Sequence, residues 1–462
     1  MKPIIPFLLL GSFGVAGAVV GGGSSQTTKV TPTAESQTQT VGPVRVQAAL
    51  ERTHLPEKQA GEVFARVGLT GIAHEKTARV RVPVSLTLVI DRSGSMGGEN
   101  KMEAANQAAC ESLRQLKGGD RYSVVSFDNG AEVVVAGTTV SSDSAIQRAC
   151  ERIGSLSARG GTDMHAGLEV GTEQAVAISG GGRVNRLLLL SDGQPDSQEG
   201  LKEQAKLLAK RGVTTTTIGL GTDYNEDLMA AVADHGLGNA HFVESRPDRG
   251  GGSAQLAKIF ATELQSMTEV VAKNAVITLT PKNGLSILDV VGYAHDKSGN
   301  RIVIPVGDVY AGRTADILLK VRHGEHAGVA DLLDVDVALT ATSDERAHAT
   351  KIAVAATFTK DQAAVTASVV KDVAVKANEW QASTALLKAN EAYNSGDFKA
   401  GDAILKDQEA KLETSASVFD SAQLNTALGD LKGYRLENSI GGMGTRASMN
   451  KKAKDKARGY AR

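Results

Sequence analysis

Between residues 84 and 270 the sequence alternates short apolar segments with longer segments of helical periodicity. Residues 85–90 (SLTLVI) and 187–190 (LLLL) contain no charged residue at all. A strand that is buried on both faces belongs to a mostly parallel sheet with helices on each side. The alternation therefore predicts an α/β domain over 84–270 with a doubly wound, mostly parallel sheet. The turn at 128–130 (DNG) predicts one antiparallel hairpin within it.

The segments on either side of this α/β domain have a different pattern. Residues 44–83 and 271–359 consist of short β-branched stretches in partial alternation, with turn signals between them. We expect the two segments to complete one β-sandwich into which the α/β domain is inserted. Residues 360–438 have helical periodicity, which favours an α-helical hairpin or a small bundle.

The two ends of the chain do not resemble folded segments. In 1–23, Lys2 precedes an apolar run with an A-x-A pattern at 16–18, which predicts a cleaved secretory signal, with an uncleaved membrane anchor as the alternative. The Ser/Thr/Gln-rich residues 24–43 are expected to be a linker, and the basic residues 439–462 a disordered tail. We therefore expect a secreted or cell-envelope protein, periplasmic or extracellular, with membrane attachment by the N-terminal segment if the signal is retained.

Composition narrows the class of partner. The chain of 462 residues has a formal net charge of -1, and this balance does not favour nucleic acid as a partner.

The two cysteines of the chain, Cys110 and Cys150, both lie in expected helices. In an oxidising compartment they are a candidate disulfide, but two small buried thiols would fit the sequence as well.

The residues 91–96 (DRSGSM), directly after the first apolar strand, place Asp91, Ser93 and Ser95 on alternate positions. A polar turn, a catalytic nucleophile and half of a metal site are the alternatives. A phosphoryl-transfer pair needs a second Asp where Ser93 stands, and a hydrolase elbow around Ser95 needs a Gly at that same position. No histidine is placed to activate Ser95, so we expect that the protein is not an enzyme.

A metal site fits the same residues better. Carboxylate and hydroxyl oxygens are the ligands that Mg²⁺, Mn²⁺ and Ca²⁺ prefer. A loop that leaves a strand in extended form points Asp91, Ser93 and Ser95 to one side. Asp192 ends another apolar strand, so it lies beyond a strand end, as Asp91 does, where open sheets bind ligands. Thr162 follows a pair of glycines and opens a helix, and it offers a further oxygen. We therefore expect these five residues to hold a divalent cation.

Together these motifs carry a resemblance to a known family. D-x-S-x-S after a buried strand, G-x-T-D before a helix and S-D-G after another strand resemble the metal-ion-dependent adhesion site of von Willebrand factor A domains. The resemblance implies that Ser93 and Ser95 ligate Mg²⁺, or Mn²⁺ or Ca²⁺, directly. Thr162 would join directly or through water, and Asp91 and Asp192 would act through waters and hydrogen bonds. An open position on the cation would then bind a carboxylate of a partner protein.

The insertion in a β-sandwich is similar to inter-alpha-trypsin inhibitor heavy chains and to bacterial secreted or surface proteins. Cation-dependent protein binding, or adhesion, is the function that this resemblance implies. A structural envelope scaffold, in which the metal only stabilises the fold, is the alternative. An accessory subunit of an ATP-driven or chelatase-type machine fits poorly with a secretory signal. We expect the long helix at 253–271 to transmit a change of state from the metal site to the sandwich.

Overall fold

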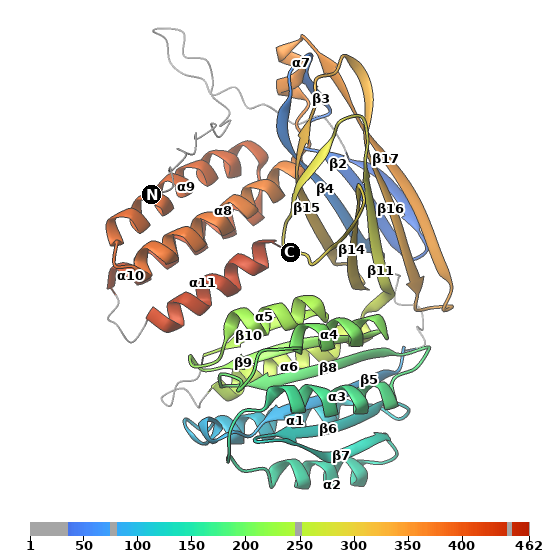
Figure 1. Ribbon diagram of the computed structural model, residues 1–462, viewed down its shortest axis with the longest axis vertical. Coiled ribbons are helices and arrows are strands. Elements are labelled where there is room, and N and C mark those ends of the chain that lie inside the picture. The colour runs from blue at the N-terminus through green and yellow to red at the C-terminus, as the bar shows by residue number, and fades with distance from the viewer. Residues whose placement is uncertain (1–35, 74–80, 245–251, 441–445, 462) are drawn as a thin grey trace.

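The computed structural model describes residues 36–73, 81–244, 252–440 and 446–461. Figure 1 shows an α/β domain below, a β-sandwich at the upper right and a group of helices at the upper left. The predicted signal or anchor at 1–23 lies outside the described residues. Within the described ranges, no helix is both long enough and apolar enough to cross a membrane.

The α/β domain contains a sheet in the order β10-β9-β8-β5-β6-β7. Its strands are β5 (Val84–Asp91), β6 (Arg121–Phe127), β7 (Ala131–Thr139), β8 (Val184–Ser191), β9 (Val213–Leu220) and β10 (Leu237–Val243). Neighbouring strands are parallel except for β6 and β7, which form the predicted antiparallel hairpin. The α/β class and the mostly parallel sheet are therefore confirmed.

Helices cover both faces of this sheet. Its helical elements are η1 (Gly94–Gly97), α1 (Lys101–Gln115), α2 (Asp143–Gly154), α3 (Met164–Ile178), α4 (Leu201–Lys210), α5 (Glu226–His235) and α6 (Ser253–Thr268). Leu88 and Ile90 of β5 share one core cluster with α1, α2 and α6, whereas Val89 belongs to the cluster of α3, α4 and α5. Because helices cover β5 on both faces of the sheet, all eight of its residues are buried.

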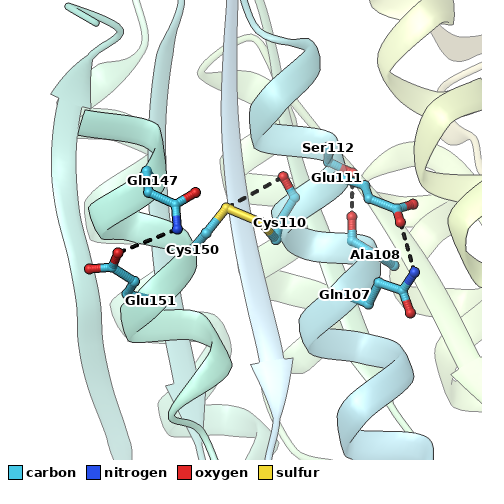
Figure 2. The surroundings of a disulfide bond; sticks show 8 residues. All are labelled: Gln107, Ala108, Cys110, Glu111, Ser112, Gln147, Cys150 and Glu151. Atoms are coloured by element: carbon cyan, nitrogen blue, oxygen red, sulfur yellow. Dashed lines mark hydrogen bonds between the residues drawn. A yellow bond between two sulfur atoms is a disulfide. The ribbon is translucent and has the colours of Figure 1, made fainter. Parts of the chain in front are cut away.

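A disulfide fastens two helices on one of these faces. Cys110 of α1 and Cys150 of α2 are bonded to each other, and the chain between them includes β6 and β7 (Figure 2). Both cysteines are buried, so the bond forms part of the packing between the two helices. The structure thus contains the disulfide that the sequence left open.

The β-sandwich is assembled from both sides of the α/β domain. Its strands are β1 (Gln37–Val41), β2 (Val44–Leu50), β3 (His54–Pro56), β4 (Gly61–Gly71), β11 (Val270–Pro281), β12 (Ser286–Val290), β13 (Asp296–Ser298), β14 (Arg301–Tyr310), β15 (Thr314–His323), β16 (Gly328–Ala341) and β17 (Ala347–Thr359). One sheet has the order β1-β2-β4-β15-β12 and the other β13-β14-β11-β16-β17-β3. Since β4 pairs with β15 and β3 with β17, the α/β domain is an insertion.

Two expectations about irregular segments were wrong. The expected linker at 24–43 contains β1, which pairs with β2 and buries Val41 in the sandwich core. The expected disordered tail at 439–462 contains a helix, α11 (Arg446–Ala461). Small apolar side chains, among them Ala453 and Ala457, bury one side of α11 in the helical core.

The remaining helices form a packed group with α11. They are α7 (Gln362–Ala367), α8 (Lys371–Asn394), α9 (Phe398–Phe419) and α10 (Ala422–Ile440). Leu386 of α8, Leu412 of α9 and Leu431 of α10 are fully buried in one core cluster. In Figure 1, α11 lies between this group and the α/β domain, so the C-terminal helix links the two.

Candidate metal centre

The carboxyl ends of β5 and β8 bring Asp91 next to Ser191. The two strands pair in parallel with Ile90 opposite Leu190, so the next residue of each strand lies at the same edge of the sheet. Ser191 Oγ donates a hydrogen bond of 2.6 Å to Asp91 Oδ2, and the Ser93 backbone N–H donates one of 2.7 Å to Asp91 Oδ1. Asp91 is thereby fixed at the base of the loop that carries the two serines.

The Asp91 carboxyl is fully buried, and this has an electrostatic consequence. Burial raises its pKa to about 6, although the hydrogen bonds from Ser191 and Ser93 lower it in part. Removing a carboxylate from water disfavours its charged form unless a positive charge lies nearby. A divalent cation at this edge of the sheet would supply that charge.

The two serine hydroxyls and Asp192 form a chain of hydrogen bonds. Ser93 Oγ and Ser95 Oγ lie 3.0 Å apart, and Ser95 Oγ donates a hydrogen bond of 2.6 Å to Asp192 Oδ1. Lys101 Nζ donates one of 2.8 Å to the other oxygen, Asp192 Oδ2. Ser95 is exposed, whereas Ser93 and Asp192 are buried, so the chain of hydrogen bonds runs from an exposed hydroxyl to a buried carboxylate.

Thr162 lies on the other side of a narrow gap at Gly193. A Cβ atom at Gly193 would lie 3.2 Å from Thr162 Oγ1 and 3.5 Å from Ser95 Oγ. The backbone N–H of Asp196 donates to the Thr162 carbonyl over 3.1 Å, which ties the loop after β8 to the segment before α3. The structure therefore brings all five predicted residues to one edge of the sheet.

This oxygen set fits a hard divalent cation. Two adjacent ligands of octahedral Mg²⁺, each about 2.1 Å from the ion, are about 3.0 Å apart, as the two serine oxygens are. Nowhere in the described ranges do three or more His, Cys, Asp or Glu side chains gather as metal ligands. A cation at this edge would consequently depend on hydroxyl oxygens, which leave its charge largely unneutralised.

The serine loop is held by its neighbours. The Gly94 N–H donates to the Gly160 carbonyl over 3.0 Å, and the Arg159 N–H to the Arg92 carbonyl over 2.7 Å. The side chains of Arg92 and Arg159 both bind Asp128 Oδ2, at 3.0 and 2.8 Å. These contacts hold the serine loop against the segment that precedes Thr162.

The other polar residues of the motifs have local roles. Asp163 caps α3 by accepting a hydrogen bond from the Ala166 N–H, and the carbonyl of Asp223 accepts one from the Gln194 side chain. His165 lies 3.0 Å from the Gln204 side-chain nitrogen, and His241 lies 2.7 Å from Glu263 Oε1. Both histidines are thus engaged with residues other than Ser95.

Ser191, Lys101 and Gly193 also lie at the site; Ser191 and Gly193 belong to the S-D-G motif but were not predicted as site residues, and Lys101 lies outside the motifs. Ser191 and Gly193 flank Asp192, and their adjacency to it was the one signal that could have found them. Lys101 stands ten residues after Asp91, at the start of a helix. Its contact with Asp192 depends on where that helix begins relative to the carboxyl ends of the strands. The helical periodicity of the sequence does not give this starting point.

Comparisons with known proteins identify the fold of the α/β domain. The family model of the von Willebrand factor type A domain matches residues 85–249. An uncharacterised protein of Synechocystis sp. is 30% identical over 243 residues, which are 52% of this chain and 55% of that protein. The uncharacterised protein YfbK of Escherichia coli is 27% identical over 263 residues, which are 54% of this chain and 43% of that protein. The chain thus spans about half the length of these curated relatives.

A solved structure extends the likeness beyond the inserted domain. The von Willebrand factor type A protein from Catenulispora acidiphila superimposes with a TM-score of 0.67 at 19% identity. The match covers 86% of this chain and 96% of that one, so the sandwich and the helices are part of a shared fold. Together, the matching family model, the parallel sheet and its strand-end motifs show that residues 85–249 of this chain form a von Willebrand factor type A domain.

Proposed function

We propose that this protein binds a protein partner through a divalent cation at the sheet edge formed by Asp91, Ser93, Ser95, Thr162 and Asp192. Domains of this family commonly bind protein ligands in this way. The observation that carries the proposal is the pair of serine hydroxyls 3.0 Å apart, on buried Ser93 and exposed Ser95, with the Ser95 hydroxyl hydrogen-bonded to the buried carboxylate of Asp192. Mg²⁺ is the cation that such a set of few protein oxygens suits best, with Mn²⁺ or Ca²⁺ as alternatives.

Each residue has a distinct task in this proposal. Ser93 and Ser95 would hold the ion directly, Thr162 directly or through water, and Asp91 and Asp192 through hydrogen bonds to their neighbours. The ion supplies an accessible positive charge that can bind a carboxylate of the partner. Since Asp91 and Asp192 already accept hydrogen bonds from serines, they orient these neighbours rather than neutralise the ion. No residue is assigned to bond-breaking chemistry, and we propose a binding protein rather than an enzyme.

Ser93→Ala tests the proposal against the alternative of a structural scaffold. We expect the variant to lose Mg²⁺ binding in calorimetry and to lose cation-dependent capture of partners, with a melting temperature in chelator equal to that of the wild type. Ser144→Ala removes an exposed hydroxyl of α2 and is the matched control. Unchanged capture of partners, combined with a large loss of melting temperature relative to the wild type when Mg²⁺ is present, would support the scaffold instead.

We further propose that the protein acts outside the cytoplasm, secreted or in the cell envelope. The disulfide between Cys110 and Cys150 supports this location, because such bonds persist in oxidising compartments and are rare in the cytosol. Cell fractionation with thiol labelling tests it. We expect the protein in the envelope or the medium, with neither cysteine labelled until the disulfide is reduced. A cytoplasmic protein whose thiols are labelled without reduction would contradict the proposal.

A further inference from the structure

Lys101 places a second positive charge inside a site that we propose binds a cation. It is the first residue of α1, and its ammonium group lies 2.8 Å from Asp192 Oδ2. The Lys101 side chain is 7% exposed and that of Asp192 is 0% exposed, so the ion pair is shielded from water. In such surroundings charges interact more strongly than at the surface.

Helix stability does not account for this lysine. The first turn of a helix carries a partial positive charge and favours acidic rather than basic side chains. Burial of an ammonium group is also unfavourable unless it is paired. Among the described residues, Asp192 is the one acidic group that pairs with this ammonium, so the position of Lys101 is explained by the site and not by α1.

The lysine changes the charge of the site. Its buried carboxylates are Asp91 and Asp192, and Arg92 is directed away to Asp128 and Glu132. With Lys101 the three ionic side chains sum to −1, and a divalent cation brings the sum to +1. Without Lys101 the corresponding sums would be −2 and 0.

The lysine also occupies an oxygen atom. Ser95 donates to Asp192 Oδ1 and Lys101 to Asp192 Oδ2, so both oxygens of this carboxylate already have a hydrogen-bond partner that competes with a direct bond to a cation. A hard cation binds an anionic oxygen more strongly than a hydroxyl, and such a bond would neutralise part of its charge. Lys101 therefore keeps Asp192 in a supporting position.

We propose that Lys101 determines the balance between the two ligands of the site: it weakens retention of the cation and strengthens capture of an anionic group by the loaded site. This inference rests on the proposed function and deepens it. The ligand class is a carboxylate held at a site of net positive charge. Lys101 is a positioning residue, because it acts through Asp192 and through its charge.

Calorimetric titration of Mg²⁺ into the full chain tests the first half of the proposal. Lys101→Gln removes the charge but keeps an N–H donor for Asp192, Lys101→Met removes both, and Lys101→Arg retains the charge as the matched control. We expect the Gln and Met variants to bind Mg²⁺ at least about tenfold more tightly and the Arg variant to stay within about threefold of wild type. Melting in chelator identifies the variants that fold, and Lys101→Gln decides the outcome if Lys101→Met does not.

Acetate titrated into the Mn²⁺-loaded protein, followed by water-proton relaxation, tests the second half. We expect the acetate concentration for half-saturation to rise at least about fivefold in Lys101→Gln and to stay unchanged in Lys101→Arg. Mg²⁺ affinity that is equal or weaker in Lys101→Gln, or equally tightened in Lys101→Arg, would overturn the inference. A wild-type protein that binds neither Mg²⁺ nor Mn²⁺ would instead overturn the proposed function itself.

Discussion

Gly193 matters to the proposed metal centre because of the side chain that it lacks. Thr162 comes from the segment before α3 and Ser95 from the loop after β5, and the gap between their hydroxyls is bordered by the backbone at Gly193. A cation site built from neutral hydroxyls depends on how closely these oxygens can approach one ion. The space kept open by this glycine is consequently a part of the site.

Gly193→Ala should weaken Mg²⁺ binding without unfolding the protein. The new methyl group would lie 3.2 Å from Thr162 Oγ1, so the hydroxyl must move by a few tenths of an ångström. We expect calorimetry to give at least about a tenfold loss of Mg²⁺ affinity, with the unfolding free energy in chelator changed by less than about 1 kcal/mol. Gly154→Ala, at a glycine with open space around it, is the control. Wild-type Mg²⁺ affinity in Gly193→Ala would show that Thr162 stands outside the site.

The effect of Mg²⁺ on stability should depend on pH through Asp91. Its pKa is about 6 in the metal-free fold, against the ordinary aspartate value of 3.8, so the folded state binds more protons between these two values. The metal-free protein therefore loses stability as pH rises from about 3.8 to about 6. Cation binding favours the charged carboxylate, so the increase in melting temperature caused by Mg²⁺ should grow with pH up to about 6 and then level off. Asp91→Asn should remove this pH dependence, and its persistence in that variant would assign it to another group.

At the scale of elements, α11 is the part of the chain that its sequence least revealed. Lys451 lies 3.9 Å from the centre of the Tyr224 ring and binds Glu226, which also binds Lys454. Burial alone would raise the pKa of Glu226, but hydrogen bonds from Lys451 and Lys454 bring it down to about 2. A basic segment with few large apolar residues has the composition of a disordered tail. The segment is ordered as α11 because acidic side chains of α5, more than 200 positions earlier in the chain, form ion pairs with its basic side chains.

Charge reversal at Glu226 should release α11 from the α/β domain. In Glu226→Lys, like charges would face Lys451 and Lys454, and amide exchange across 446–461 should accelerate by about tenfold or more, which corresponds to ~1.4 kcal/mol. Glu173→Lys makes the same change of charge on the exposed side of α3 and should leave α11 protected. Combining Glu226→Lys with Lys451→Glu and Lys454→Glu should recover part of the protection. Exchange that stays slow in the single variant would mean that Ala453 and Ala457 suffice to hold the helix.

Elements that are marked by a local sequence pattern could be predicted from the sequence. Apolar strands such as β5 and β8 can be recognised without knowing which strands they pair with, and the D-x-S-x-S motif places its hydroxyls directly after the end of β5. Lys101 could not be assigned, because its contact with Asp192 depends on how α1 leaves the sheet edge. The strand β1 was missed because most of its residues are exposed and polar, so no apolar alternation marks it.

For the whole molecule, a buried ionic network joins the two larger units. Arg186 of β8, with a side chain that is 1% exposed, binds Glu263 of α6 at 2.8 Å and Asp308 of β14 at 3.3 Å. It also donates to the hydroxyl of Tyr310, which lies at the end of β14. One side chain of the inserted domain is therefore shared with the sandwich, at the sheet edge opposite the metal centre.

Arg186→Met should destabilise both units together. It would leave Glu263 and Asp308 buried without the Arg186 guanidinium that they share, and breaking a buried ion pair typically costs about 3–5 kcal/mol. Urea unfolding should give a lower midpoint for the whole protein, while Arg148→Met at an exposed position of α2 should leave it unchanged. A midpoint that does not move in Arg186→Met would show that apolar contacts alone join the two units.

The insertion also sets the direction in which a bound partner would pull. The inserted domain is connected to the sandwich through the start of β5 and through the step from α6 to β11, whereas the serines follow the far end of β5. A tensile load applied at Ser93 and Ser95 and resisted by the sandwich would run along the axis of β5. Its hydrogen bonds to β6 and β8, on either side, would then be loaded in shear and would share the force. The strand that carries the serine loop is thus also the strand placed to withstand mechanical tension.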